Sequence, residues 1–231
     1  ERFMKHYFLV AKDVGDLTRI MSAVLEAQQI KQVPSMSELF ERFGWRSIKL
    51  DDEGIFKIET GRISAVDETL FVRDPVSIIR LFRVAEHNNL SIHPTTLQLV
   101  RRSRRAIDKQ MRADPVANEL FLDILTKSRD PEAVLRRMSE AGVLGRGIPE
   151  FGRITALMQF NMYHHYTVDE HLIRAVGILS KIDQGLLKQD HPVASGIIQG
   201  VVSRRVLYVA VLLHDIAKGR KEDHSIAGAK V

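Results

Sequence analysis

Apolar residues recur with helical spacing near the start of the chain. The first such stretch follows the i, i+3, i+4, i+7, i+8 pattern of an amphipathic helix, with Leu17, Ile20, Met21, Val24 and Leu25. Asp16 precedes this stretch and is placed to cap the helix. The pattern is lost abruptly near Gln32 and Val33. If the sequence omits a disordered loop, this is the place where the two flanking segments would be joined. We therefore expect an N-terminal helix followed by a break.

A change of period after the break predicts a small sheet. Residues 55–63 alternate apolar and polar side chains around Gly61, the pattern of a short strand or hairpin. We expect this hairpin to be the only sheet of the protein.

Short helices are predicted from residue 74 onward. Three pairs place an N-cap acceptor before a proline at the first helical position: Asp74-Pro75, Asp114-Pro115 and Asp130-Pro131. His93-Pro94 opens one more helix, which carries a run of arginines. The apolar sets that follow each pair fit a helical bundle up to about residue 151. The small residues of 142–149 predict a hinge, and hence domains at 1–151 and 152–231.

Composition narrows the chemistry. The chain of 231 residues is 45% hydrophobic and 27% charged, and its 6% of aromatic residues favours helices over a β-sandwich. Cysteine is absent, which excludes disulfides, thiolate zinc sites and a cysteine nucleophile. Any metal must therefore be bound by histidines and carboxylates. No apolar run approaches the roughly 20 residues of a membrane span, and residues 1–6 do not resemble a signal peptide, so we expect a soluble cytoplasmic protein.

Positive charge is concentrated between residues 73 and 112. This segment holds nine basic against three acidic residues, enough to account for the net charge of +5. Its centre, Arg101, Arg102, Arg104 and Arg105, is a candidate surface for an acidic partner or nucleic acid. Such a run is also typical of an ordinary solvated helix face.

Three polar residues end an apolar run at 209–218. If the run is helical, His214, Asp215 and Lys218 share one side of it, so that imidazole and carboxylate could bind a divalent ion beside a phosphate held by the ammonium. The alternative is that they cap a core helix, with Lys218 in solvent. A capping box of Thr167 and Glu170 places His171 in the first turn of an earlier helix. The 43 positions between His171 and His214 allow the two helices to lie side by side.

These residues resemble a known superfamily. His171, His214 with Asp215 and Lys218, and His224 together are similar to the HD metal-dependent phosphohydrolases. Residues 160–171, 212–220 and 222–228 look like one branch, the bacterial bifunctional PII uridylyltransferase/uridylyl-removing enzymes. The resemblance extends to 2–16 and 73–82.

The resemblance implies a domain order and a fold. In that family a nucleotidyltransferase domain is followed by a helical linker, an HD domain and two ACT domains that sense glutamine. We therefore expect a mainly α fold: a helical linker bundle with one short β-hairpin, then the first part of a truncated HD domain. The paired-aspartate motif of nucleotidyl transfer is absent, and the chain stops at Val231, before the distal aspartate of the HD metal shell.

The resemblance also implies an activity. It points to hydrolysis of the UMP-tyrosyl phosphodiester on uridylylated PII, without a membrane or nucleic acid as partner. His171, His214 and Asp215 would bind Mg²⁺ or Mn²⁺, although a histidine-rich shell would equally admit Fe or Zn. Lys218 would stabilise charge on the phosphate, and His224 would bind a second ion or substrate. Two alternatives stay open: an HD enzyme acting on free nucleotides, and a non-catalytic basic helical binding module.

Overall fold

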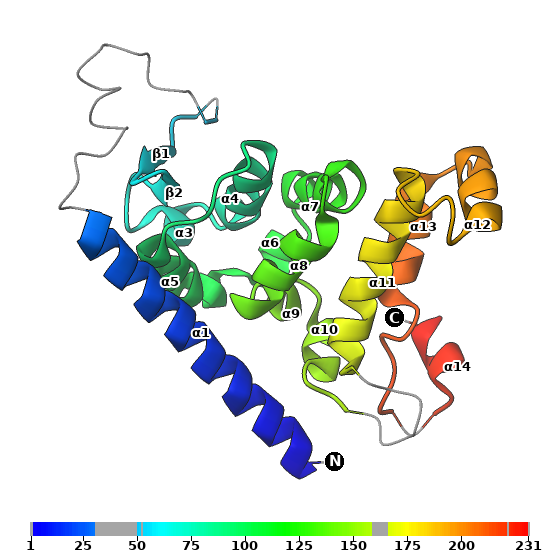
Figure 1. Cartoon of the computed structure of the whole chain (residues 1–231). Coiled ribbons are helices and arrows are strands. Elements are labelled where there is room, and N and C mark those ends of the chain that lie inside the picture. The colour runs from blue at the N-terminus through cyan, green and yellow to red at the C-terminus, as the bar shows by residue number, and fades with distance from the viewer. Residues whose placement is uncertain (1, 31–49, 52, 159–165, 221, 231) are drawn as a thin grey trace. The chain divides into compact units, whose positions relative to one another are not determined.

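The structure is a computed structural model that describes residues 2–30, 50–51, 53–158, 166–220 and 222–230. The predicted break near Gln32 and Val33 lies outside these residues. Within them the protein is mainly helical, and its one sheet is a two-stranded antiparallel hairpin (Figure 1). The expected fold class is therefore confirmed. No described helix combines the length and apolar character needed to cross a membrane.

The first half of the chain contains α1 (Arg2–Ile30), β1 (Phe56–Glu59), β2 (Arg62–Ala65), α3 (Leu70–Arg73), α4 (Val76–His87), α5 (Pro94–Ser103), a 3₁₀ turn (Arg104–Ala106) and α6 (Lys109–Arg112). The second half contains α7 (Pro115–Lys127), α8 (Pro131–Glu140), α9 (Leu144–Gly147), α10 (Pro149–Ile154), α11 (Val168–Asp183), α12 (Pro192–Ile197), a second 3₁₀ turn (Ile198–Gly200), α13 (Arg204–Leu213) and α14 (His224–Gly228).

Two compact units divide the chain. One contains Val10–Ala117, and the other contains residues 1–9 with Asn118–Val231. Helices α9 and α10 occupy most of the segment 142–149, which the sequence predicted as a hinge. The predicted domain boundary after residue 151 stays a prediction, because compactness and the domain order of a family need not divide a chain at the same place.

Helix α1 extends the predicted N-terminal helix. It begins at Arg2, so Asp16 lies well inside it, and the prediction that Asp16 caps it is wrong. The apolar pattern that predicted the helix starts only at Leu17, whereas the helix continues through the earlier residues. A row of apolar side chains at alternating spacings of four and three residues is exposed along it: Phe3, Tyr7, Val10, Val14, Leu17, Met21 and Val24.

The hairpin belongs to the unit of residues 10–117. Phe56 pairs with Ala65 and Glu59 with Arg62, in antiparallel register. The turn residues Thr60 and Gly61 have φ of 50° and 72°, the left-handed conformation that two-residue hairpin turns require. The core of this unit is formed by the hairpin together with α3, α4 and α5, through Ile63, Phe71, Ile78, Leu81, Phe82 and Val100.

Two of the three aspartates that were predicted to cap helices do so, and the third does not. Asp114 accepts from the N–H of Ala117 at 3.0 Å, and Asp130 accepts from that of Ala133 at 3.0 Å, which confirms both caps. The predicted cap at Asp74 is wrong. Asp74 instead closes α3, since its N–H donates to the carbonyl of Leu70 at 2.8 Å, and α4 starts without a side-chain cap.

In the other unit, α11 lies between α8 and α13 (Figure 1). The interior of this unit is built from buried side chains of these three helices: Val134, Leu135, Met138, Leu172, Val176, Tyr208 and Leu212. Gly177 of α11 faces Glu132 of α8 so closely that a β-carbon there would lie 2.1 Å from Oε2 of Glu132. The two helices therefore pack at a distance that requires glycine.

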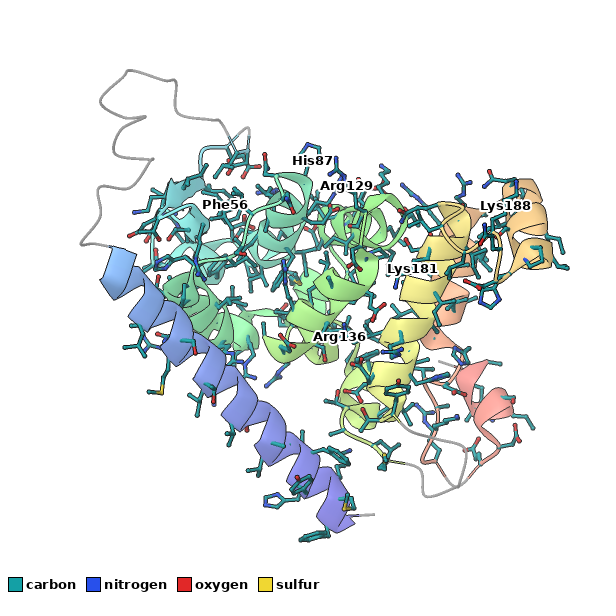
Figure 2. All side chains as sticks on the ribbon, in the orientation of Figure 1. Phe56, His87, Arg129, Arg136, Lys181 and Lys188 are labelled. Carbon is teal, nitrogen blue, oxygen red and sulfur yellow. The ribbon has the colours of Figure 1, made fainter. Side chains whose placement is uncertain are left out.

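The start of α11 is fixed by charges and not by a capping box. Thr167 occupies the N-cap position, but its side chain makes no capping hydrogen bond. Glu170 instead forms an ion pair with Arg136 of α8, which is labelled in Figure 2. The predicted capping box is therefore wrong. Asp169, which is buried, accepts from the N–H of Ala156 at 3.1 Å and anchors this end of α11.

The apolar run at 209–218 is not one helix. Helix α13 ends at Leu213, and His214 is its C-cap residue. Successive turns follow as far as Gly219, which has a φ of 79°. Lys218 and Asp215 are joined within these turns by the backbone hydrogen bond from Lys218 N–H to the carbonyl of Asp215, at 3.0 Å. His214 and Asp215 are therefore presented by a helix end, where the chain changes direction.

Candidate metal centre

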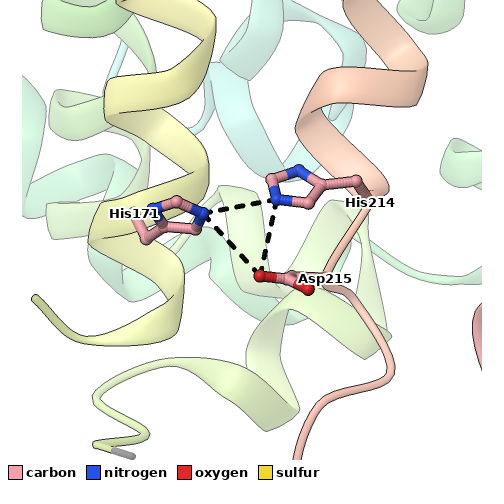
Figure 3. Close-up of side chains that lie close together, drawn as sticks. All are labelled: His171, His214 and Asp215. Carbon is pink, nitrogen blue, oxygen red and sulfur yellow. Dashed lines mark hydrogen bonds and ion pairs between the residues drawn. The ribbon is translucent and has the colours of Figure 1, made fainter. Parts of the chain in front are cut away.

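Two helices bring three possible metal ligands together. His171 is in the first turn of α11, and His214 and Asp215 follow the last turn of α13. The His171 and His214 Nε2 atoms lie 3.3 Å apart, and Oδ2 of Asp215 lies 3.7 Å from the first and 3.4 Å from the second (Figure 3). Within the described residues, this is the one cluster of three or more such side chains that could hold a metal ion.

The spacing of these atoms suits a divalent ion. A triangle with sides of 3.3, 3.4 and 3.7 Å has a circumscribed radius of about 2.0 Å, close to the metal–ligand distances of roughly 2.0–2.2 Å for histidine nitrogens and carboxylate oxygens. The donor set has two nitrogens and one oxygen, which suits Mn²⁺, Fe²⁺ or Zn²⁺ and admits Mg²⁺ through the carboxylate. The three side chains therefore fit a divalent ion, and its identity as Mg²⁺ or Mn²⁺ stays a prediction.

The orientation of His214 is set by the end of α13. Its Nδ1 lies 2.8 Å from the carbonyl oxygen of Val211. A carbonyl can only accept, so Nδ1 carries the proton in this hydrogen bond. In the neutral ring the lone pair is then on Nε2, which points toward His171 and Asp215. A helix carbonyl thus selects the tautomer that can bind a metal.

Asp215 is buried and has a cationic neighbour. Its side chain is 9% exposed, and its Oδ2 lies 2.7 Å from the ammonium of Lys218, which is 12% exposed. The reading of Lys218 as a solvated cation is therefore wrong. This shielded ion pair offsets the cost of burying the carboxylate. The two histidines are each 43% exposed, so the cluster opens to solvent on the imidazole side.

His224 is the first residue of α14, whose N-cap is Asp223. The position of its side chain is not among those that the structure describes. Its role as a ligand for a second ion or for substrate stays a prediction.

The arginine run lies in the unit of residues 10–117. Arg101 and Arg102 end α5, whereas Arg104 and Arg105 form the 3₁₀ turn that follows, so the run is not one helical face. Arg102, Arg104 and Arg105 are exposed. Arg104 also donates from Nε to the carbonyl of Arg101 at 2.9 Å, which closes the end of the helix. A partner for this surface stays a prediction.

One pair near the start of α11 was missed from the sequence. The guanidinium of Arg174 lies over the ring of Tyr166, 4.5 Å from its centroid. Arg174 is three residues after His171 on α11, a spacing that places both side chains on neighbouring parts of one helix face. That spacing was the available signal, but it does not show that Tyr166, before the helix, holds the arginine.

A comparison with protein families matches the segment before the cluster. Residues 56–146 match the family model described as the third domain of the uridylyltransferase GlnD. The match includes the hairpin, the helices α3 to α8 and the arginine run. It ends before His171, so the candidate ligands rest on their own geometry.

Proposed function

We propose that His171, His214 and Asp215 form a metal-dependent phosphodiesterase site in this chain, whose residues 56–146 match the third-domain model of the uridylyltransferase GlnD. Its substrate is the phosphodiester that links UMP to a tyrosine of the signal protein PII. The convergence of two imidazole nitrogens and one carboxylate oxygen within 3.7 Å of one another carries the proposal.

The metal in this proposal is Mg²⁺ or Mn²⁺. A divalent ion supplies Lewis acidity: it lowers the pKa of a nearby water and withdraws charge from a phosphoryl oxygen. The imidazoles of His171 and His214 are each 43% exposed, so water and substrate would reach an ion held by the three ligands from that side. That arrangement is typical of catalytic sites, which keep positions open for water and substrate, and not of closed structural sites.

The reaction needs one water and no other reactant. Water oxygen forms a bond to phosphorus while the bond from phosphorus to the tyrosine oxygen breaks. The proton lost by water balances the proton gained by the tyrosine, so UMP and the free hydroxyl are the products. The roles of the chain are to hold the ligands, as Val211 does for His214, and to keep cationic groups beside the phosphate.

Lys218 has a positioning role in this site. Its ammonium donates to the Oδ2 atom of Asp215 at 2.7 Å, and this contact holds the carboxylate in place beside the histidines. The proposal that Lys218 also stabilises charge on the phosphate requires it to contact substrate from this position.

The test uses metal binding and UMP release together. Mn²⁺ bound to the protein is measured by electron paramagnetic resonance, and UMP release is measured on uridylylated PII. Asp215→Ala is expected to lower release by on the order of 10²-fold or more, because a ligand is lost. His214→Gln should do the same while leaving Asp215 and Lys218 paired.

Asp190→Ala is the matched control, because Asp190 is exposed and removed from the cluster in sequence. It should leave both measurements unchanged. Unaltered UMP release by Asp215→Ala and His214→Gln would refute the proposal. Hydrolysis of free nucleotides in place of uridylylated PII would keep the metal site and replace the substrate.

A further inference from the structure

Arg174 contacts an aromatic ring near the start of α11. Its guanidinium stacks on the ring of Tyr166 at 4.5 Å from the centroid. In the described part of the chain it makes no hydrogen bond and no ion pair, unlike Arg136 of the same unit, which contacts both Glu132 and Glu170. An arginine has five N–H donors in a planar fork that fits phosphate. Among the described residues, the fork of Arg174 is therefore held in place with its N–H donors unengaged.

The position of Arg174 relates it to the metal cluster. Arg174 and His171 are three residues apart on α11, so their β-carbons are roughly 5–6 Å apart. Helix side chains lean toward the N-terminus. Arg174 does so here, because the ring under its guanidinium belongs to Tyr166, which precedes the helix. Its side chain thus leans toward the N-terminal end of α11, the end that carries His171.

The other cation of the site is already engaged. Lys218 lies 2.7 Å from Asp215 and is 12% exposed. Arg174 is only partly buried, and Tyr166 is 45% exposed. Arg174, three residues from His171 on the same helix, is therefore a partly exposed cation with no ion-pair partner among the described residues.

We propose that Arg174, held by Tyr166, binds the phosphate oxygens of a nucleoside 5′-phosphate group at the His171–His214–Asp215 site. The inference rests on the proposed function for its choice of ligand. Arg174 then contacts the phosphate, a role that would otherwise fall to Lys218 alone. Tyr166 is a positioning residue, because it acts by keeping the guanidinium beside the helix.

The experiment measures UMP binding by isothermal titration calorimetry, with Mn²⁺ and separately with EDTA. Arg174→Gln should weaken UMP binding about tenfold in both conditions, since a charge-assisted contact to phosphate is lost. Uridine, which has no phosphate, should bind Arg174→Gln and the unchanged protein equally. Arg137→Gln is the control with the same charge change, because Arg137 is exposed on α8.

Variants of Tyr166 test the positioning role. Tyr166→Phe keeps the ring and should retain UMP affinity, whereas Tyr166→Leu should weaken it about three- to fivefold, the equivalent of an exposed cation–π contact. Equal UMP affinity in Arg174→Gln and the unchanged protein would overturn the inference. An equal loss of uridine binding would also overturn it, because the contact would then be to the base.

The two proposals fail in different measurements. If the unchanged protein binds no Mn²⁺, the proposed phosphodiesterase is wrong, while the dependence of UMP binding on Arg174 in EDTA still decides the inference. If Mn²⁺ binds and Asp215→Ala abolishes UMP release but Arg174→Gln leaves UMP affinity unchanged, the phosphodiesterase stands and Arg174 is structural.

Discussion

At the scale of single residues, the candidate ligands could be predicted, but their environment could not. His171, His214 and Asp215 were identified from residue type, from the separation of two helices and from a family resemblance. The hydrogen bond from His214 to the carbonyl of Val211 could not be predicted from the sequence, because any backbone carbonyl could accept it. The burial of Lys218 was missed for a related reason. The run at residues 209–218 was interpreted as one helix, whereas α13 ends at Leu213, five residues before Lys218.

His93 predicts a pH dependence of stability. Its pKa is lowered from its ordinary value of 6.5, chiefly because burial disfavours the imidazolium, with Arg62 and Lys57 acting in the same direction and Glu59 opposing them. The unfolded chain therefore binds this proton more readily than the native protein. Stability contributed by neutral His93 is present above about pH 6.5 and is lost as the pH falls below it.

The measurement is the free energy of unfolding in urea at several values between about pH 5 and pH 8. His93→Asn keeps an N-cap acceptor for the N–H of Thr95 and removes the titrating group. The pH dependence of this variant should be shallower on the acidic side than that of the unchanged protein. Parallel curves would show that His93 does not contribute.

At the scale of elements, the sequence predicted a helix cap correctly where the capping residue adjoins only one helix. Asp114 and Asp130 each precede a single helix, and both cap it as predicted. Asp74 lies between two helices and serves the end of α3, a choice that depends on which helix is formed upstream. Thr167 and Glu170 failed as a capping box because Glu170 pairs with Arg136, 34 positions away. Long-range ion pairs of this kind leave no local pattern.

Gly177 predicts a specific cost at the contact of α8 and α11. A β-carbon at this position would lie 2.1 Å from Oε2 and 2.8 Å from Cβ of Glu132, so Glu132 would have to move. Gly177→Ala should lower the free energy of unfolding by about 1–3 kcal/mol, because crowding outweighs the helix-propensity gain of roughly 1 kcal/mol. Chemical denaturation followed by circular dichroism would measure the change.

Gly196→Ala is the matched control. Gly196 is also helical, in α12, and nothing lies within 4 Å of a β-carbon there. This substitution should be stabilising by about 0.5–1 kcal/mol. The double variant Gly177→Ala with Glu132→Ala should recover much of the loss if Glu132 is the obstacle. A cost that persists in the double variant would place the strain elsewhere.

At the scale of the whole molecule, the fold class was predictable from the sequence, whereas the domain boundary after residue 151 stays a prediction. Periodicity and helix-start pairs were enough for a mainly helical chain with one hairpin. Small residues at 142–149 suggested a hinge, yet α9 and α10 form there, and a β-carbon on Gly145 would lie 3.0 Å from the backbone of Gly152. Small residues serve close helix contacts as well as linkers, and composition does not distinguish the two uses.

The metal should stabilise one compact unit selectively. All three candidate ligands belong to the unit that contains Asn118–Val231. An ion that binds only the native state adds about 2.7 kcal/mol at a concentration one hundred times its dissociation constant. Hydrogen exchange with and without Mn²⁺ should therefore show slower exchange in α11 and α13, with the hairpin and α4 unchanged.

His214→Gln provides the reference, since it should abolish the difference between the two conditions. Slower exchange confined to residues 10–117 would contradict the assignment of the ligands. Slower exchange that persists in His214→Gln would show that Mn²⁺ acts at another place.

The exposed apolar row of α1 has a consequence for handling the protein. Phe3, Leu17 and Met21 are 76%, 59% and 64% exposed. Helix α1 therefore exposes apolar surface of the kind that most soluble proteins expose only when they unfold. Fluorescent dyes that report unfolding by binding exposed apolar surface would then fluoresce with the native protein as well. Melting curves based on such dyes would start from a high baseline, and spectroscopic signals from the backbone are the better choice for every stability measurement above.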